Sequence, residues 1–233
     1  MLVLGHRGAS VAAPENTPAA FRLADAMGAD GVELDVRRAP DGRVLVAHDP
    51  LPEATDRLDR YPTLEDVLDA CGERMLVNVE IKNLSIDADH DPTMAIVGPV
   101  IDTLRRRGTA DRWLISSFSW STLEACREAD ATVRTAWLCQ RLDTERVVRC
   151  AEVGHVAVHP AERFVTSQLV ERCHEAGLAV NTWTCNEPDR LVELASFGVD
   201  GVCTDVPDVS LEALGRPDPD VRPVWARWPR PVT

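Results

Sequence analysis

The stretch Gly31-Val-Glu-Leu-Asp-Val36 has the alternation of a β-strand, with apolar side chains at every second position. Successive side chains on a strand point to opposite faces, so Glu33 and Asp35 share one face. Two carboxylates on one buried face repel each other and lose their hydration unless a cation neutralises them. The strand is therefore predicted to carry a functional group as well as part of the core.

Short apolar runs of this kind recur along the chain and are separated by amphipathic helical patterns. The candidate strands are 2–5, 31–36, 76–81, 113–117, 133–138, 156–158, 179–183 and 201–204. Eight strands alternating with helices predict an α/β fold of the (β/α)8, or TIM-barrel, type. A doubly wound open sheet is the alternative, but it often carries a glycine-rich phosphate loop, and neither GxGxxG nor GxxxxGK[ST] occurs in the chain.

Polar side chains lie at the ends of several of these strands. His6 follows the first strand, Glu80 and Lys82 end the third, Trp183 ends the seventh and Asp205 follows the eighth. The carboxyl ends of barrel strands meet at one mouth, where the active sites of such enzymes lie. Functional groups spread over separate strands therefore favour the barrel over the open sheet.

The region that follows the second strand is predicted to be short and simple. An Asp41-Gly42 turn predicts a hairpin strand over 43–47 that carries His48 toward the carboxylates. The next segment, 49–61, is expected to form a turn and a brief extended stretch. Helices are expected from Pro18 to Gly28, from a capping box at Thr63 to Cys71, and over 94–107, 119–129, 143–151, 166–176, 187–197 and 208–214.

Length and composition fit one large domain or two small ones, and the chain is assigned as a single barrel domain with a tail. The chain has 233 residues, of which 45% are hydrophobic, and residues 1–214 are assigned to the barrel with a proline- and tryptophan-rich tail over 215–233. Trp225 and Trp228 in the tail are expected to pack on the barrel or on a neighbouring chain. No apolar run approaches the about 20 residues that span a bilayer, and the N-terminus lacks the pattern of a signal peptide. We expect a cytoplasmic protein without stable membrane insertion, and oligomerisation stays open.

Charge and cysteine content exclude several partners. A net charge of −13 argues against nucleic acid, which is bound through clustered lysine and arginine. It does not argue against a small anionic substrate, because a bound cation can make a local positive site. The seven cysteines form no CxxC pair, so we expect reduced, buried thiols rather than a zinc site.

Glu33, Asp35 and Glu80 are the candidate metal ligands. A third carboxylate on the next strand would complete an oxygen-only set, which suits Mg²⁺ or Ca²⁺ better than zinc. The alternative is that Arg7, Arg37 or Lys82 neutralises the carboxylates in salt bridges without a metal.

His6 and His48 are the candidate catalytic residues. Histidine carries protons near pH 7, so a pair of histidines can remove one proton from a nucleophile and give another to a leaving oxygen. The alternative for either residue is a polar group hydrogen-bonded to the backbone. His159, at the end of the sixth strand, is expected to have a packing role.

Four further residues are candidates for substrate binding. Arg7 offers a planar fork for phosphate oxygens, and Lys82 adds a point charge on the same face as Glu80. A structural role for Arg7 as an internal strut is the alternative. Trp183 and Phe118 are expected to form an apolar wall, although a lone tryptophan more often belongs to a core.

These motifs, in this order and spacing, resemble the glycerophosphodiester phosphodiesterase family over about residues 2–209. The matching segments are Gly5–Ser10, Pro14–Phe21, Gly28–Arg38, Asp41–Pro50, Pro62–Leu68, Leu76–Lys82, Ser116–Leu123, Gly177–Asn186 and Gly198–Pro207. The resemblance implies a metal-dependent TIM-barrel hydrolase of glycerol and lipid metabolism that cuts glycerophosphodiesters to glycerol 3-phosphate and an alcohol. It also implies metal ligation by Glu33, Asp35 and Glu80, acid–base catalysis by His6 and His48, and phosphate contacts from Arg7 and Lys82.

One departure from the family's pattern concerns the segment between His48 and Pro62. Family members usually carry a long capping insertion there, whereas this chain has only residues 49–61. A reduced cap leaves a more open mouth, so activity on bulkier diesters, like that of lysophospholipase D or sphingomyelinase D, is the alternative function. The second alternative is a barrel that binds such a ligand without turnover.

Overall fold

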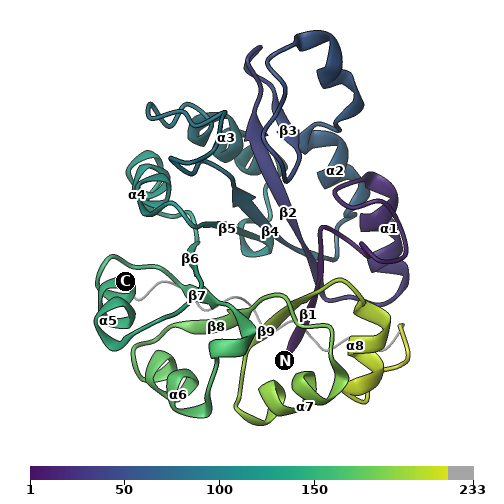
Figure 1. The fold of residues 1–233 in the computed structure, drawn as a ribbon, viewed down its shortest axis with the longest axis vertical. Coiled ribbons are helices and arrows are strands. Elements are labelled where there is room, and N and C mark those ends of the chain that lie inside the picture. Colours follow the sequence, from purple (N-terminus) through teal and green to yellow (C-terminus); the bar gives the residue numbers. More distant parts are fainter. Residues whose placement is uncertain (220–233) are drawn as a thin grey trace.

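A computed structural model describes residues 1–219, which form a closed barrel (Figure 1). The strands are β1 (Leu2–His6), β2 (Gly31–Arg38), β3 (Val44–Val46), β4 (Leu76–Ile81), β5 (Trp113–Ser117), β6 (Thr135–Cys139), β7 (Ala157–Pro160), β8 (Ala179–Thr182) and β9 (Gly201–Thr204). All of them except β3 pair in parallel, and β1 pairs with both β2 and β9 to close the ring. The predicted TIM barrel is confirmed, and the open-sheet alternative is wrong.

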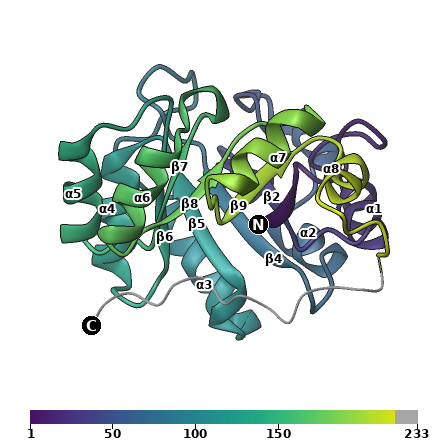
Figure 2. The same ribbon diagram turned by 90° about the horizontal axis from the view of Figure 1, so that it is seen from below.

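Helices surround this ring of strands. They are α1 (Pro18–Ala26), α2 (Leu64–Ala70), α3 (Val97–Arg107), α4 (Trp120–Ala129), α5 (Thr144–Glu152), α6 (Ser167–Glu175), α7 (Pro188–Ser196) and α8 (Pro207–Ala213). Figure 2 shows the same strands in a view turned by 90°, with helices packed along their outer faces. Each predicted helix is present, with ends shifted by a few residues, and the capping box at Thr63 forms with Asp66.

Side-chain alternation along β2 explains how one strand serves both the core and the mouth. Val32, Leu34 and Val36 are fully buried and pack against the helices. Glu33 and Asp35 point into the barrel instead, as period-2 alternation requires. Deeper inside, an apolar cluster that includes Leu4 fills the barrel, so it is a packed core with polar groups only toward its mouth.

The hairpin strand β3 is confirmed, and it lies beside β2 outside the ring. It pairs antiparallel with β2, with Val46 opposite Val36 and Val44 opposite Arg38. The backbone N–H of Val46 also donates to the carbonyl of Pro62 at 2.9 Å. These bonds on both sides fix the strand that leads to His48.

The expectation for segment 49–61 is wrong in part. Residues Thr55–Arg60 form a 3₁₀-helix, η1, instead of only a turn and an extended stretch. Leu58 within it is fully buried in a small cluster with Leu45, Ala47 and Leu51. A short 3₁₀ turn needs no long helical pattern, and burial of this one leucine stabilises it. The segment remains too short for a separate capping lobe.

Other predictions concern the cysteines, the membrane and the tail. All seven cysteines are buried and unbridged, as expected. None of the helices in residues 1–219 is long and apolar enough to cross a membrane. Trp225 and Trp228 lie outside the described residues, so the prediction for the tail stays a prediction.

Candidate active site

Three buried carboxylates meet at the mouth of the barrel. Glu33 and Asp35 come from β2 and Glu80 from β4, and one oxygen of each lies within 4.8 Å of the others. Their exposed fractions are 4%, 1% and 7%. The predicted convergence is therefore present, at a separation that one divalent cation can bridge with oxygen bonds of about 2.0–2.6 Å.

Glu33 is the least compensated of the three carboxylates. Its Oε2 accepts the backbone N–H of Arg7 at 3.2 Å, while its buried Oε1 accepts no hydrogen bond from residues 1–219. Burial, together with the charges of Asp35 and Glu80, raises the pKa of Glu33 well above its usual range. Burial likewise raises the pKa of Glu80 to about 7, against the lowering effect of Lys82. An orphaned buried oxygen beside two further carboxylates fits a bound cation.

Two side-chain cations already share the site. Lys82 Nζ lies 2.7 Å from Glu80 Oε1 and 3.1 Å from Asp35 Oδ1, and Arg7 Nε lies 3.1 Å from Asp35 Oδ2. Burial by itself would raise the pKa of Asp35, but Lys82, Arg7 and a hydrogen bond from Asn16 together lower it. The salt-bridge alternative thus applies to Asp35 and Glu80. Two positive side chains do not neutralise three carboxylates, however, so the cluster keeps a net negative charge when all three are ionised.

Lys82 is the only lysine in the chain, which otherwise uses arginine for its basic residues. A compact ammonium fits between Asp35 and Glu80, where a guanidinium would need more room. Arg37, the third cation considered in the sequence, is not part of this cluster. It pairs with Asp87 and Asp89 instead, at 3.1 and 2.6 Å.

His6 is held by a carboxylate from the far end of the chain. Its Nδ1 lies 2.7 Å from Asp205 Oδ1, while Nε2 lies 3.9 Å from Glu33 Oε2. Asp205 also accepts hydrogen bonds from Asn186 and Ser10 at 2.7 and 3.1 Å. Although burial opposes ionisation, the bonds from His6 and Asn186 lower the pKa of Asp205 to about 2. An ionised Asp205 accepts the Nδ1 proton of His6 and leaves Nε2 facing the cavity.

Hydrogen bonds to both the backbone and the side chain of His48 hold this residue in position. Its Nδ1 lies 2.9 Å from Asp49 Oδ1, and its carbonyl accepts Nε of Arg37 at 2.9 Å. Arg37 is almost fully buried and binds Asp87 and Asp89 through its other nitrogens. The loop that carries His48 is therefore tied to the segment after β4, which sequence reasoning did not foresee.

All nine residues predicted for the site except Asp35 line one cavity of about 430 Å³. Phe118 and Trp183 form its apolar wall, with ring centroids 5.3 Å apart and planes at right angles. Asp35 lies directly behind, in contact with Arg7 and Lys82. His159 also lines the cavity, but burial lowers its pKa to about 3 and its Nε2 bonds to Asn181, so it stays neutral, in keeping with the packing role expected for it.

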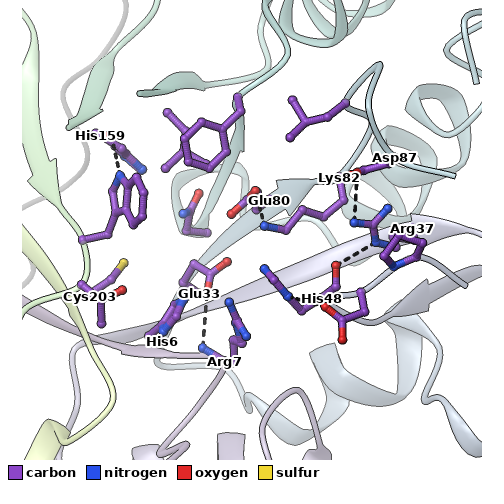
Figure 3. A pocket seen from close by; sticks show the side chains of 18 of the residues that line it. His6, Arg7, Glu33, Arg37, His48, Glu80, Lys82, Asp87, His159 and Cys203 are labelled. Atoms are coloured by element: carbon purple, nitrogen blue, oxygen red, sulfur yellow. Dashed lines mark hydrogen bonds and ion pairs between the residues drawn. The ribbon is translucent and has the colours of Figure 1, made fainter. Parts of the chain in front are cut away.

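Chemically, the cavity brings together acids, bases and cations around a space for a small anion. Figure 3 shows His6, Glu33, Glu80 and the Lys82 ammonium pointing toward the same space. Oxygen ligands for a hard cation stand next to two imidazoles that can move protons. The arrangement is that of a TIM-barrel enzyme with a hydrolytic site at the carboxyl ends of its strands.

Comparison with known proteins gives the family. A sequence profile described as "Glycerophosphoryl diester phosphodiesterase family" matches residues 6–60 and 52–209. A relative described as "Probable glycerophosphodiester phosphodiesterase 1", from Mycobacterium tuberculosis, is 40% identical over 88% of this chain and 89% of its own length. The "Glycerophosphodiester phosphodiesterase" of Caldanaerobacter subterraneus is 29% identical over 91% of this chain and 97% of its own. The chain belongs to the glycerophosphoryl diester phosphodiesterase family and is a phosphoric diester hydrolase.

Solved structures agree with this assignment. A glycerophosphodiester phosphodiesterase from Thermotoga maritima superposes with a TM-score of 0.73 at 26% identity, covering 93% of this chain and 98% of that one. An Oleispira antarctica phosphodiesterase, solved with the product sn-glycerol-3-phosphate, superposes with a TM-score of 0.82 at 22% identity. It covers 92% of this chain and 97% of that one, and at this identity it shows a shared fold.

Proposed function

We propose that this chain hydrolyses glycerophosphodiesters to glycerol 3-phosphate and an alcohol, with a divalent cation and with His6 and His48 as acid and base. The observation that carries the proposal is the gathering of both histidines and the carboxylate cluster around one cavity. The product bound to the Oleispira antarctica relative, sn-glycerol-3-phosphate, supports the same substrate class.

Glu33, Asp35 and Glu80 would hold the cation, which we take to be Mg²⁺ or Ca²⁺ because every ligand is a carboxylate oxygen. When bound, the ion supplies Lewis-acid polarisation of a phosphate oxygen and lowers the pKa of the attacking hydroxyl or water. Lys82, whose ammonium lies against Asp35 and Glu80 at the cavity, would offer a positive charge to a phosphate oxygen of the substrate. Arg7 adds a second cation, although its contacts with Asp35 and Glu15 also suit a structural strut.

The two histidines divide the proton transfers between them. His6, with Nδ1 bonded to Asp205, presents Nε2 to the reacting phosphate and can accept or give one proton there. His48 stands at the rim, where its half-exposed ring can exchange the other proton with the nucleophile or the leaving oxygen. Water or the neighbouring glycerol hydroxyl is the nucleophile in either assignment.

The direct test is metal-dependent release of alcohols from a panel of water-soluble diesters. With choline, ethanolamine, glycerol and inositol diesters, we expect activity that needs Mg²⁺ or Ca²⁺. We also expect kcat/KM to vary by less than about 100-fold across them, about 2.7 kcal/mol, because the short segment 49–61 supplies few groups to select among them. Lysophospholipids in the same panel test the alternative function. Absence of turnover of every diester with either metal would refute the proposal.

Asp205 is expected to act as the residue that positions His6. Asp205→Asn can donate a hydrogen bond to Nδ1 and thereby favour the wrong tautomer of His6, so kcat should fall by about 10–100-fold, the usual cost of losing such a partner. KM should change little, because Asp205 contacts His6 and does not line the cavity. Asp208→Asn, an exposed carboxylate on α8, is the matched control. A full-rate Asp205→Asn enzyme would contradict this role.

A further inference from the structure

A second hollow adjoins the catalytic cavity at the mouth of the barrel. It is shallow and wide open to solvent, and it extends from the end of β6 to the 3₁₀-helix η3 (Glu162–Phe164) that follows β7. Phe118 and Leu138 line both hollows. Lys82 Nζ stands 5.9 Å from the ring centroid of Phe118, on the side of the catalytic cavity. A substrate whose phosphate lies at Lys82 can therefore extend past Phe118 into the second hollow.

Three arginines line this second hollow, and each stacks on an aromatic ring. The guanidinium carbon of Arg141 is 4.1 Å from the ring centroid of Phe164, and that of Arg163 is 4.7 Å from the same ring. The guanidinium carbon of Arg146 lies 5.7 Å from the ring of Trp137. Stacking of this kind restrains the planar groups and leaves N–H groups along their edges that can bind a ligand.

Few negative charges offset these arginines. Within residues 1–219 no carboxylate lies within 4 Å of Arg141 or Arg163, and Arg163 donates to the neutral Gln140 Oε1 at 2.6 Å. Only Arg146 has an acidic partner, Asp143, at 3.4 Å. In a chain with a net charge of −13, such a concave cationic surface beside the catalytic cavity points to an anionic ligand.

We propose that the second hollow binds a phosphate group carried by the leaving alcohol, so that diesters with an anionic leaving group are cleaved in preference to neutral ones. This rests on the function proposed above. Guanidinium forks match phosphate oxygens in geometry as well as charge. The glycerol phosphate part is common to all substrates of this class and the leaving alcohol is the part that varies, so we place the alcohol at Arg141 and Arg163. The cations covering the ring of Phe164 also make the hollow unsuited to an acyl chain.

The test compares two diesters that differ only in the far end of the leaving group. Both join glycerol 3-phosphate to 1,3-propanediol, and one carries a phosphate on the far hydroxyl. The wild-type enzyme should cleave the phosphorylated diester with the higher kcat/KM. In the double variant Arg141→Gln/Arg163→Gln the ratio of the two kcat/KM values should fall by about 10-fold, equivalent to about 1.4 kcal/mol. Arg74→Gln removes an exposed arginine just before β4, at the opposite end of the barrel, and should leave the ratio unchanged.

An unchanged ratio in the double variant would overturn the inference. If the wild-type enzyme cleaves neither diester, the proposed function fails separately, and binding of 3-hydroxypropyl phosphate measured by calorimetry still tests the hollow. We expect the double variant to bind this phosphate at least about 5-fold more weakly than the Arg74→Gln protein, and equal affinity would refute the site. Binding to phosphatidylglycerol vesicles that the double variant loses, with an unchanged ratio, would assign the arginines to a lipid surface instead.

Discussion

Replacing His6 or His48 by alanine is expected to lower kcat by about 10²–10⁴-fold, the usual worth of a positioned acid or base. His6 presents Nε2 to the cavity because Asp205 holds its Nδ1, and His48 lines the same cavity from the loop after β3. Neither ring is part of the apolar core, since the His6 and His48 side chains are 20% and 38% exposed. The free energy of unfolding should therefore change little.

Steady-state kinetics on a glycerophosphodiester, with thermal unfolding of each variant in parallel, separates catalysis from folding. His174→Ala is the matched control, because that histidine lies on α6 at the outside of the barrel and pairs with Asp200. Added imidazole should restore part of the activity of His48→Ala, whose vacated space opens to solvent, and less of that of His6→Ala. A fully active His48→Ala enzyme would remove His48 from the proposed mechanism.

The parts of this site that can be predicted from the sequence are those set by residues close to one another along the chain or by a repeated pattern. Glu33 and Asp35 are two residues apart, so strand alternation alone places them on one face, and the hairpin after Asp41-Gly42 is equally local. The ring closure that brings Glu80 to them follows from eight repeated strand–helix units. These features were predicted correctly because each is specified by neighbouring residues or by a repeated pattern.

The features that were missed are set by contacts between distant segments. Asp205 pairs with His6 across 199 positions, and although it was noted at the end of a strand, nothing in its neighbourhood indicates that partner. Arg37 and Asp89 likewise meet only because the loop after β4 folds back over β2. The 3₁₀-helix around Leu58 arises from burial of one side chain in a tertiary cluster, which no periodicity records. Contacts of this kind can be identified only once the folded structure is known.

Removing one carboxylate from the proposed metal site is expected to abolish most activity and at the same time to stabilise the ion-free protein. Glu33→Gln keeps the size of the side chain but removes a charge whose Oε1 accepts no hydrogen bond from the described residues. Loss of an inner ligand should cost more than the 10–100-fold typical of outer partners, so we expect kcat/KM to fall by more than about 100-fold. Asp35→Asn is expected to be less well tolerated in folding, because it breaks ion pairs with Arg7 and Lys82.

The stability effect follows from the sign of the pKa shift. Burial raises the folded-state pKa of Glu33 above its unfolded value, so at pH 7 its ionisation opposes folding. Glutamine at this position removes that cost, and a gain of about 1 kcal/mol would raise Tm by about 2–4 °C in a chain of this size. Glu15→Gln, on an exposed carboxylate that binds the other side of Arg7, is the matched control for charge removal.

Metal titration followed by thermal unfolding then distinguishes a cation site from a cluster neutralised only by Arg7 and Lys82. At a Mg²⁺ or Ca²⁺ concentration about 100 times Kd, binding to the native state alone stabilises it by about 2.7 kcal/mol. Wild-type protein should therefore gain several degrees in Tm with the ion, lose them with a chelator, and lose activity in parallel. Glu33→Gln should begin at the higher Tm without the ion and gain much less with it. The opposite result would be a wild-type Tm that does not change when either metal is added, together with activity that persists in the presence of a chelator. That result would show that Lys82 and Arg7 neutralise the carboxylates without a metal ion.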